Sequence, residues 1–248
     1  MNIAVCVSQV PDTTTKLVVG GDGKNIDPKG VKFILNPYDE FAVEEALRRR
    51  EKNGGAVTLV CVGGDSAKET LRLGLAMGAD KAVLIKDEAR ADSFTVAREL
   101  ATVLRELAPD LILLGRQSID YDSAQMGPTL GELLELPCIS FVTSLEIDGT
   151  TVRAERDIEG GKEVVETTLP CIITTQKGLN EPRYPKLPDI MKAKSKPVED
   201  RAGGDREDRV ATIVMRPPDK KGAGKIFDAS PETIKELVRL LHEEAKVI

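Results

Sequence analysis

The chain has 248 residues, of which 41% are hydrophobic and 31% charged, with a formal net charge of −6. This length predicts one large domain, or one domain with appendages, and the hydrophobic fraction suffices for a sizeable core. Mixed charge signs, 3% aromatic residues and the absence of Trp disfavour nucleic-acid binding, which relies on clustered Lys and Arg and on stacking aromatic rings.

The first half of the chain alternates strand patterns with helix patterns. Short runs rich in Val, Ile and Leu occupy residues 2–8, 56–62, 81–86 and 110–115. Helix patterns lie between them: one has Asn36 as its N-cap and Pro37 at its first position, a second begins at Ser66 with a capping-box Glu69, and a third ends before Pro109. Apolar strands that alternate with helices predict an α/β fold with a doubly wound, mostly parallel sheet covered on both faces.

The second half changes character. Residues 137–175 predict three or four strands, with hairpin turns at Asp148–Gly149 and at Glu159–Gly161. Residues 176–229, rich in Pro, Lys, Asp and Gly, predict an extended arm with little core of its own, in which 209–215 is a candidate for one more strand. The last helix pattern begins at Ser230 and has an apolar face formed by Ile234, Leu237, Val238 and Leu241. Such an arm favours burial against another chain.

Several classes of site and location are disfavoured. The N-terminal run has no basic region or cleavage site, and no apolar stretch approaches the roughly 20 residues of a membrane helix. The four cysteines lie far apart in strand-like runs and predict buried thiols. The single histidine, His242, cannot by itself build a metal site or a catalytic triad. We therefore expect a cytoplasmic, metal-free protein that is not embedded in a membrane.

A ligand is expected where the loops leave the carboxyl ends of the strands. The polar loop 115–125 follows an apolar strand and leads into a helix expected to begin near Gln125, because Pro128 fits only a first turn. Backbone N–H groups at a helix start predict a phosphate site, to which Arg116 adds a fork donor. A well-capped surface loop is the alternative. With no Gly-x-Gly-x-x-Gly and no nucleophile–base set in the sequence, a binder is favoured over a catalyst, and no catalytic residue is assigned.

Seven stretches, in order along nearly the whole chain, resemble β subunits of electron-transfer flavoproteins. They are Asn36–Ala46, Leu75–Asp80, Leu114–Asp120, Arg156–Gly161, Leu169–Ile173, Leu179–Tyr184 and Leu187–Lys194. The resemblance implies a Rossmann-like domain of the adenine-nucleotide-binding type at 1–185. It also implies an arm at 186–248 that wraps around an α subunit, with which the chain forms a heterodimer. In this family the α subunit holds most of a redox-active FAD.

The resemblance further implies that this chain binds AMP or, in electron-bifurcating members, a second FAD. Carried over by position, the cofactor-binding residues are Cys6, Asn36, Pro37, Tyr38, Asp39, Val62, Gly115, Arg116, Gln117, Ser118, Ile119, Asp120, Ser123, Ala124, Gln125 and Met126. Tyr38 and Thr13 fall where the family approaches the partner-held flavin, although Thr13 replaces a common aromatic residue. Asp157 falls where the family keeps an acid that can pair with an α-subunit arginine.

A second set of residues matches the loop with which the family docks flavin dehydrogenases. These partner-docking residues are Leu187, Pro188, Ile190, Met191 and Lys192. An apolar anchor with a basic rim suits a small, transient interface. The alternative is that these side chains pack onto their own domain.

The resemblance implies an electron carrier rather than an enzyme. Electrons would pass from flavin dehydrogenases, such as those of the acyl-CoA dehydrogenase type, to a quinone-linked oxidoreductase. One alternative is a bifurcating complex in which a second FAD in this chain oxidises NADH. Gly115–Pro128 looks closer to bifurcating members, whereas Phe41–Glu45 and Leu187–Lys192 look closer to ordinary ones. Another alternative is a stand-alone ATP-binding stress-type domain, which the arm disfavours because such a domain would not need one.

Overall fold

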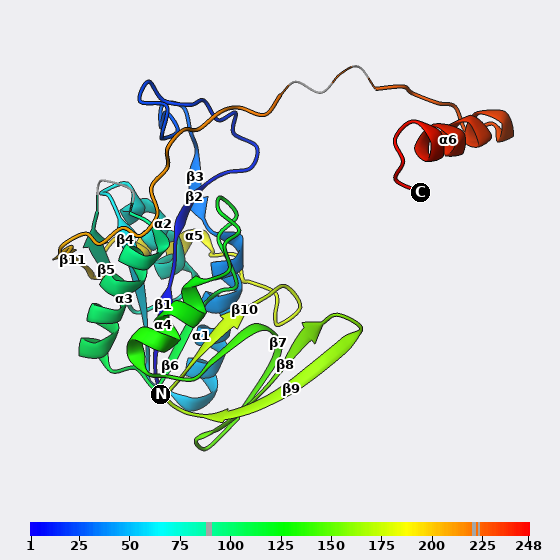
Figure 1. Ribbon diagram of the computed structural model, residues 1–248. Coiled ribbons are helices and arrows are strands. Elements are labelled where there is room, and N and C mark those ends of the chain that lie inside the picture. The colour runs from blue at the N-terminus through cyan, green and yellow to red at the C-terminus, as the bar shows by residue number, and fades with distance from the viewer. Residues whose placement is uncertain (88–90, 220–221, 223) are drawn as a thin grey trace.

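A computed structural model describes residues 1–87, 91–219, 222 and 224–248 (Figure 1). Within these residues, nine strands form one sheet in the order β11-β5-β4-β1-β6-β10-β7-β8-β9. They are β1 (Asn2–Cys6), β4 (Ala56–Gly63), β5 (Lys81–Lys86), β6 (Leu111–Gly115), β7 (Cys138–Asp148), β8 (Thr151–Ile158), β9 (Gly161–Thr168), β10 (Cys171–Thr175) and β11 (Val198–Ala202). Neighbours from β11 to β7 are parallel, whereas β7, β8 and β9 pair antiparallel. The predicted fold class is confirmed.

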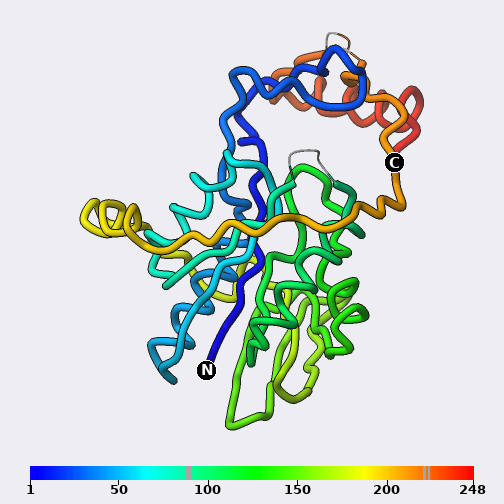
Figure 2. Tube along the Cα trace, turned by 90° about the vertical axis from the view of Figure 1, so that its left-hand side faces the viewer, coloured from blue at the N-terminus to red at the C-terminus, as the bar shows by residue number. Residues whose placement is uncertain are grey.

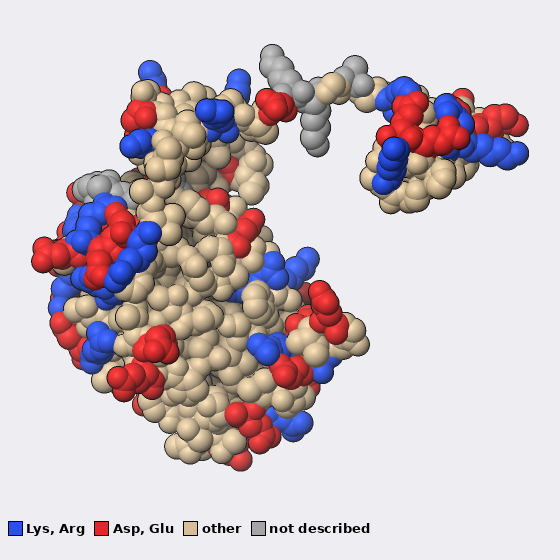
Figure 3. All heavy atoms as spheres, viewed as in Figure 1, with Lys and Arg blue, Asp and Glu red and all other residues tan. Residues whose placement is uncertain are grey.

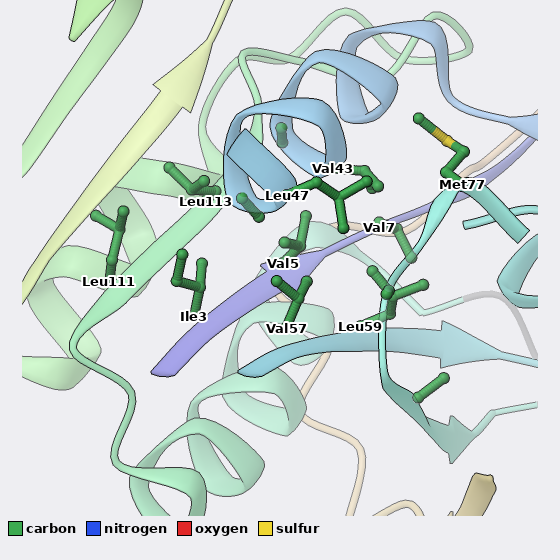
Figure 4. Packing of buried hydrophobic residues seen from close by; sticks show 14 of the residues in the cluster. Ile3, Val5, Val7, Val43, Leu47, Val57, Leu59, Met77, Leu111 and Leu113 are labelled. Atoms are coloured by element: carbon green, nitrogen blue, oxygen red, sulfur yellow. The ribbon is translucent and has the colours of Figure 1, made fainter. Parts of the chain in front are cut away.

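Helices cover both faces of the parallel part of the sheet. One face carries α1 (Pro37–Asn53) and α2 (Ala67–Met77), and the other carries α3 (Ser93–Leu107) and α4 (Met126–Leu134). Alternate residues of a strand point to opposite faces, so the core has two layers. Ile3, Val5 and Val7 pack beneath α1 (Figure 4). The intervening Ala4 and Cys6 pack towards α3 and α4.

Most predicted elements form, with ends shifted by a residue or two. The hairpin turns at Asp148–Gly149 and Glu159–Gly161 separate β7, β8 and β9 as expected. Some local expectations are wrong. Ser66 is the residue before α2 but makes no capping bond, because its hydroxyl donates instead to Gln9 Oε1 at 2.9 Å. Residues 209–215 form no strand, and there Val210 and Ile213 are 72% and 81% exposed.

Part of the predicted arm joins the sheet. After β10, the short helix α5 (Leu187–Ala193) contacts α2, and β11 then pairs with β5 in parallel. The segment that follows is fixed to α3 by side chains: Asp208 accepts hydrogen bonds from the backbone N–H of Asp92 at 3.0 Å and from Thr95 Oγ1 at 2.8 Å. The domain boundary at residue 185 stays a prediction. The structure shows that β11, which follows this boundary, belongs to the main sheet.

The remaining segments project from the domain. The strands β2 (Gln9–Pro11) and β3 (Phe33–Leu35) are joined by a long loop that extends from the domain at the top of Figure 1. The arm contacts this loop where the Met215 N–H donates to Gly23 O at 2.7 Å. Near the C-terminus, α6 (Pro231–Glu243) stands apart from the domain (Figure 1). Charged side chains gather on one side of α6, while Ile234 and Val238 are 52% and 50% exposed on its apolar face (Figure 3).

On the face seen in Figure 3, positive and negative side chains are interspersed rather than gathered into areas of one sign. The segment after β11 illustrates this, since Arg98 pairs with Glu207 and Arg206 pairs with Asp208. Among the helices of the described residues, none combines the length and the apolar character that crossing a membrane requires.

Candidate nucleotide site

The order of the strands reverses between β1 and β6. From β1 the chain builds outwards through β4 and β5, and it then crosses back to place β6 on the other side of β1. Open α/β sheets bind ligands at such a reversal, beyond the carboxyl ends of the strands, and we call this region between β1 and β6 the crevice. The residues that leave these two strands are Val7–Ser8 and Gly115–Arg116, and the start of α1 lies beside them.

Asp39 ties the carboxyl ends of β1 and β6 together. It lies in the first turn of α1 and is 4% exposed. Its Oδ2 accepts hydrogen bonds from the backbone N–H and the hydroxyl of Ser8, each at 2.8 Å, and its Oδ1 accepts one from the Gly115 N–H at 2.8 Å. The helix dipole also favours an anion at this position. A single carboxylate therefore sets the spacing of the crevice.

Burial raises the pKa of Asp39 to about 6, and the hydrogen bonds from Ser8 and Gly115 limit the rise. Burial also raises the pKa of the thiols of Cys6 and Cys61, the two central cysteines of this region. All four cysteines are free, and three of them are buried. These thiols therefore act as apolar packing groups, because a raised pKa keeps them protonated.

Asn36 positions the loop that follows β6. The sequence pattern predicts it as the helix cap of α1, and it does precede the helix, but it makes no capping bond. Its side chain instead donates from Nδ2 to Gln117 O at 2.9 Å, and its Oδ1 accepts from the Ile119 N–H at 3.3 Å. Asn36 is 1% exposed, so this contact is part of the packed interior. The start of α1 thus fixes both strand ends and the loop.

The loop itself is held in an unusual backbone conformation. Asp122 and Ala124 have φ values of 52° and 51°, in the left-handed region that non-glycine residues rarely adopt. Asp122 is stabilised there by its N–H bond to Ser118 O and by Gln117 Nε2, at 2.9 Å and 2.6 Å. Left-handed residues within a turn orient backbone N–H groups into an anion-binding concavity. The strain therefore favours a phosphate-binding role.

The loop ends at the N-terminus of α4. The helix begins at Met126, next to the predicted start near Gln125, and Gln125 makes no side-chain capping bond. The first N–H groups of a helix have no acceptor within the helix, and the dipole favours an anion there. Gly127 brings this helix end close to β10, since a Cβ added at Gly127 would lie 2.3 Å from Thr174 Cγ2. The donors of this helix end therefore border the same crevice.

Arg116 lies on the side of the crevice that faces α1 and β7. Its guanidinium carbon is 5.0 Å from the centroid of the Tyr38 ring and 5.6 Å from that of Phe141. Its Nη1 donates to Gln176 Oε1 at 2.8 Å, and its Nε is buried without a hydrogen-bond partner. Cation–π contacts and one hydrogen bond thus hold this side chain within the protein.

The other predicted residues divide between the crevice and the surface. Cys6 is buried at the end of β1, and Val62, near the end of β4, packs against the same core layer. Pro37, Tyr38 and residues 116–119 are half-buried around the crevice, whereas Asp120 and Ser123 are exposed. Thr13 and Asp157 are both exposed, and neither is a hydrogen-bond partner of Asn36 or Asp39.

The partner-docking residues lie on α5, away from the crevice. Leu187 and Met191 are 73% and 57% exposed. Ala193, in contrast, is buried. Figure 2 shows this short helix projecting from the side of the domain. These apolar side chains form an accessible surface on an exposed helix. The geometry therefore disfavours the alternative that they pack onto their own domain.

Four residues of the site were not predicted from the sequence. Ser8 holds Asp39, and Thr175 Oγ1 donates to Tyr38 O and Leu114 O at 3.2 Å each. Phe141 and Gln176 contact Arg116 from β7 and from the residue after β10. Ser8 carries a usable signal, because it directly follows a strand whose carboxyl end borders the predicted crevice. The others depend on the position of β10 between β6 and β7.

Comparison with known sequences identifies the family. A family model described as the electron transfer flavoprotein domain matches residues 24–205. The electron transfer flavoprotein subunit beta of Bacillus subtilis is 47% identical, and the comparison covers 100% of both chains. The chain belongs to the electron transfer flavoprotein family. The mitochondrial subunit beta of rice (Oryza sativa subsp. japonica) is 39% identical over 100% of both chains.

Membership extends to the β-subunit group, since several relatives with that name align over their full length. Protein FixA of Azorhizobium caulinodans is 40% identical over 78% of this chain and 72% of its own. The resemblance carried by the seven stretches is confirmed. The chain therefore is an electron transfer flavoprotein subunit of the β type, with a role in electron transport.

Proposed function

We propose that the chain is the smaller subunit of a heterodimeric electron carrier, whose α subunit holds most of a redox-active FAD. Family membership and full-length similarity to β subunits support this. The observation that carries the proposal is the arm, since α6 stands apart from the domain and exposes Ile234, Leu237 and Val238 on one face. An amphipathic helix gains its stability from burying such a face. The α subunit supplies the surface that covers it.

Electrons pass from flavin dehydrogenases, such as the acyl-CoA dehydrogenase type, to a quinone-linked oxidoreductase. FAD supplies the chemistry, because it accepts and releases electrons reversibly. The side chains of this subunit help to position and enclose the cofactors, and none of them serves as a catalytic group. The cytoplasmic location expected from the sequence stays part of this proposal.

The crevice between β1 and β6 is the proposed AMP site. Backbone N–H groups of the 118–126 loop, other than those of Ile119 and Asp122, and of the first turn of α4 would hold the phosphate. Two observations support the fit: the left-handed conformations of Asp122 and Ala124, and the start of α4 without a side-chain cap. Asp39 and Asn36 hold the strand ends and the loop, so the site is ordered before the nucleotide arrives.

Arg116 acts on this site by holding the loop. Its guanidinium is engaged with Tyr38, Phe141 and Gln176, so the backbone N–H groups are the better candidates for the phosphate contact. Replacing Arg116 by Ala is still expected to weaken nucleotide retention, because the loop would lose its anchor to β7. If Arg116 instead contacts the phosphate directly through its guanidinium fork, Arg116→Lys should lose as much bound nucleotide as Arg116→Ala, because Lys cannot form the fork.

The exposed side chains of α5 form the proposed docking surface for dehydrogenases. Leu187 and Met191 supply an apolar centre, and Lys192 supplies a basic rim. A small surface of this kind suits brief encounters between electron-transfer partners. Leu187→Ala is expected to raise the KM for the dehydrogenase about tenfold or more, since a buried Leu contributes roughly 1.5–3 kcal/mol.

A second candidate function is electron bifurcation, with a second FAD in place of AMP and NADH as electron donor. The sequence of the loop Gly115–Pro128 favours it, because that loop looks closer to bifurcating members. The two functions use the same crevice. They differ in what the crevice holds and in the reaction with NADH.

Nucleotide release from the co-expressed heterodimer tests both functions. Acid treatment followed by chromatography should yield one FAD and one AMP per heterodimer, and NADH should leave the flavin absorbance unchanged. Two FAD without AMP, together with bleaching by NADH, would establish the bifurcating alternative. A heterodimer that releases no adenine nucleotide besides the single FAD would refute the crevice as a nucleotide site.

A further inference from the structure

The helix α5 cannot be held in place by its own packing. It has seven residues, whereas isolated helices shorter than about 12–15 residues are marginal in water. Leu187, Ile190 and Met191 are 73%, 42% and 57% exposed, and Ala193 is its one buried residue. Anchors from other elements are therefore needed to keep this helix formed with its apolar side chains turned outwards.

Two cations provide such anchors by reaching in opposite directions between α2 and α5. Arg72, on α2, donates from Nη1 to Ala193 O at 2.6 Å and to Lys196 O at 2.7 Å. Lys196, just after α5, donates from Nζ to Leu75 O at 2.9 Å and to Ala79 O at 2.6 Å. Each helix thus receives at its C-terminus a cation that belongs to the other. We call this pair the Arg72–Lys196 clamp.

The clamp satisfies groups that neither helix satisfies alone. The last carbonyl groups of a helix lack donors within the helix, and they carry the negative end of its dipole. The last turn of α2 contains no basic residue of its own. Lys196 therefore supplies the cation that α2 lacks, whereas Arg72 adds a second cation at the end of α5, whose last turn already contains Lys192.

The chain is also tied down where it enters α5. Arg183 pairs with Glu44 at 2.7 Å and with Glu51 at 2.6 Å, both on α1. Asn180 donates to Phe41 O at 3.0 Å. With these contacts before the helix and the clamp after it, α5 projects from the domain but has both ends fixed (Figure 2).

We propose that Arg72 and Lys196 are positioning residues for dehydrogenase docking, which hold α5 preformed with Leu187 and Met191 exposed. This inference rests on the docking role proposed for α5. A surface that is already ordered avoids the cost of ordering its side chains at every encounter. Loss of the clamp should therefore weaken the encounter and leave the later electron-transfer step intact. The contacts of Arg72 and Lys196 all lie at the C-terminal ends of α2 and α5 and in the residues just after them, and none involves a residue of the nucleotide crevice.

The test uses the heterodimer with its dehydrogenase. Arg72→Met and Lys196→Met should each raise KM about tenfold, as expected when two or three side chains must be ordered on binding, with kcat within about twofold of wild type. Arg72→Lys should restore most of the affinity, because a single nitrogen, Nη1, makes both bonds of Arg72. Lys81→Met, an equal loss of charge at an exposed position on β5, should leave KM unchanged.

Amide hydrogen exchange separates positioning from general destabilisation. In the two clamp variants, residues 187–196 should exchange faster while β1 and β6 keep their protection. Faster exchange with an unchanged KM, in a protein whose KM does respond to Leu187→Ala, would overturn the clamp and leave the docking role standing. An unchanged KM in Leu187→Ala as well would overturn both. A KM rise in Arg72→Lys as large as in Arg72→Met would also contradict the clamp.

Discussion

Replacing Gly115 by Ala tests whether the close approach of α1 to the end of β6 organises the crevice. A Cβ at this position would lie 2.5 Å from Asp39 Oδ1, 2.6 Å from Tyr38 Cβ and 2.7 Å from the Tyr38 carbonyl carbon. Real Cβ atoms essentially never make contacts this short. Two of these atoms belong to the backbone or its attached Cβ, so α1 or β6 must shift as a unit.

Two effects contribute to the cost. Overpacking a well-packed interior destabilises by about 1–3 kcal/mol. Displacing Asp39 also weakens the hydrogen bond of 2.8 Å from the Gly115 N–H to a charged acceptor, which is worth about 1.5–3 kcal/mol. Since the two are coupled, we expect a loss of about 2–5 kcal/mol in the free energy of unfolding. For a chain of this size that lowers Tm by roughly 4–20 °C.

Thermal unfolding of the heterodimer measures the effect, and nucleotide content measures its consequence at the site. Gly115→Ala should release substoichiometric AMP, because the loop begins at the displaced strand end. Gly21→Ala is the matched control: a Cβ at Gly21 meets nothing within 4 Å, and its φ is not in the positive region. A Gly115→Ala heterodimer with the Tm and AMP content of wild type would refute the role given to this contact.

Three further predictions concern the same site and the arm. Because the pKa of Asp39 is raised from 3.8 to about 6, the folded state binds this proton more tightly than the unfolded state. The advantage of wild type over Asp39→Asn should therefore shrink by up to about 3 kcal/mol as pH rises from 4 to 7, and a constant difference would contradict it. Gly127→Ala places a Cβ 2.3 Å from Thr174 Cγ2, so equilibrium dialysis should show weaker AMP binding, and unaltered affinity would remove α4 from the site. The chain expressed alone should aggregate and carry little FAD, whereas co-expression with the α subunit should give a 1:1 flavin-containing complex; a monodisperse, fully flavinated single chain would argue against the proposed burial of the arm.

The elements that the sequence predicts well are those with a strong local pattern. The runs around Ile3, Leu59, Leu84 and Leu113 become central strands, because each is apolar on both faces of a covered parallel sheet. The helix start near Gln125 follows from the conformational limits of Pro128, which act within one turn. In such cases the local signal and the tertiary environment require the same structure.

The elements that the sequence misses depend on a distant partner. Residues 198–202, Val-Glu-Asp-Arg-Ala, show no apolar alternation, and they form β11 because β5 offers an unpaired edge. Residues 209–215 are more apolar, yet they lie beyond that edge and form no strand. Asn36 and Ser66 were both predicted as caps, and both bond instead to residues far along the chain, Gln117 and Gln9. A side chain near two competing partners cannot be assigned from its own sequence neighbours.

The strained residues of the chain give an argument for the site that does not depend on resemblance. Among the described residues, six other than glycine have positive φ: Ala108, Asp122, Ala124, Glu135, Phe141 and Lys246. Ala108 and Glu135 end helices, where the left-handed conformation is common, and Lys246 lies near the C-terminus. The remaining three all belong to the crevice: Asp122 and Ala124 form the loop, and Phe141 supports Arg116. Strain of this kind persists only where the surroundings over-determine it. The strain that helix ends and the terminus do not explain therefore lies around the carboxyl ends of β6 and β10, beside which Phe141 sits near the start of β7. This concentration identifies the same edge of the sheet as a candidate binding site.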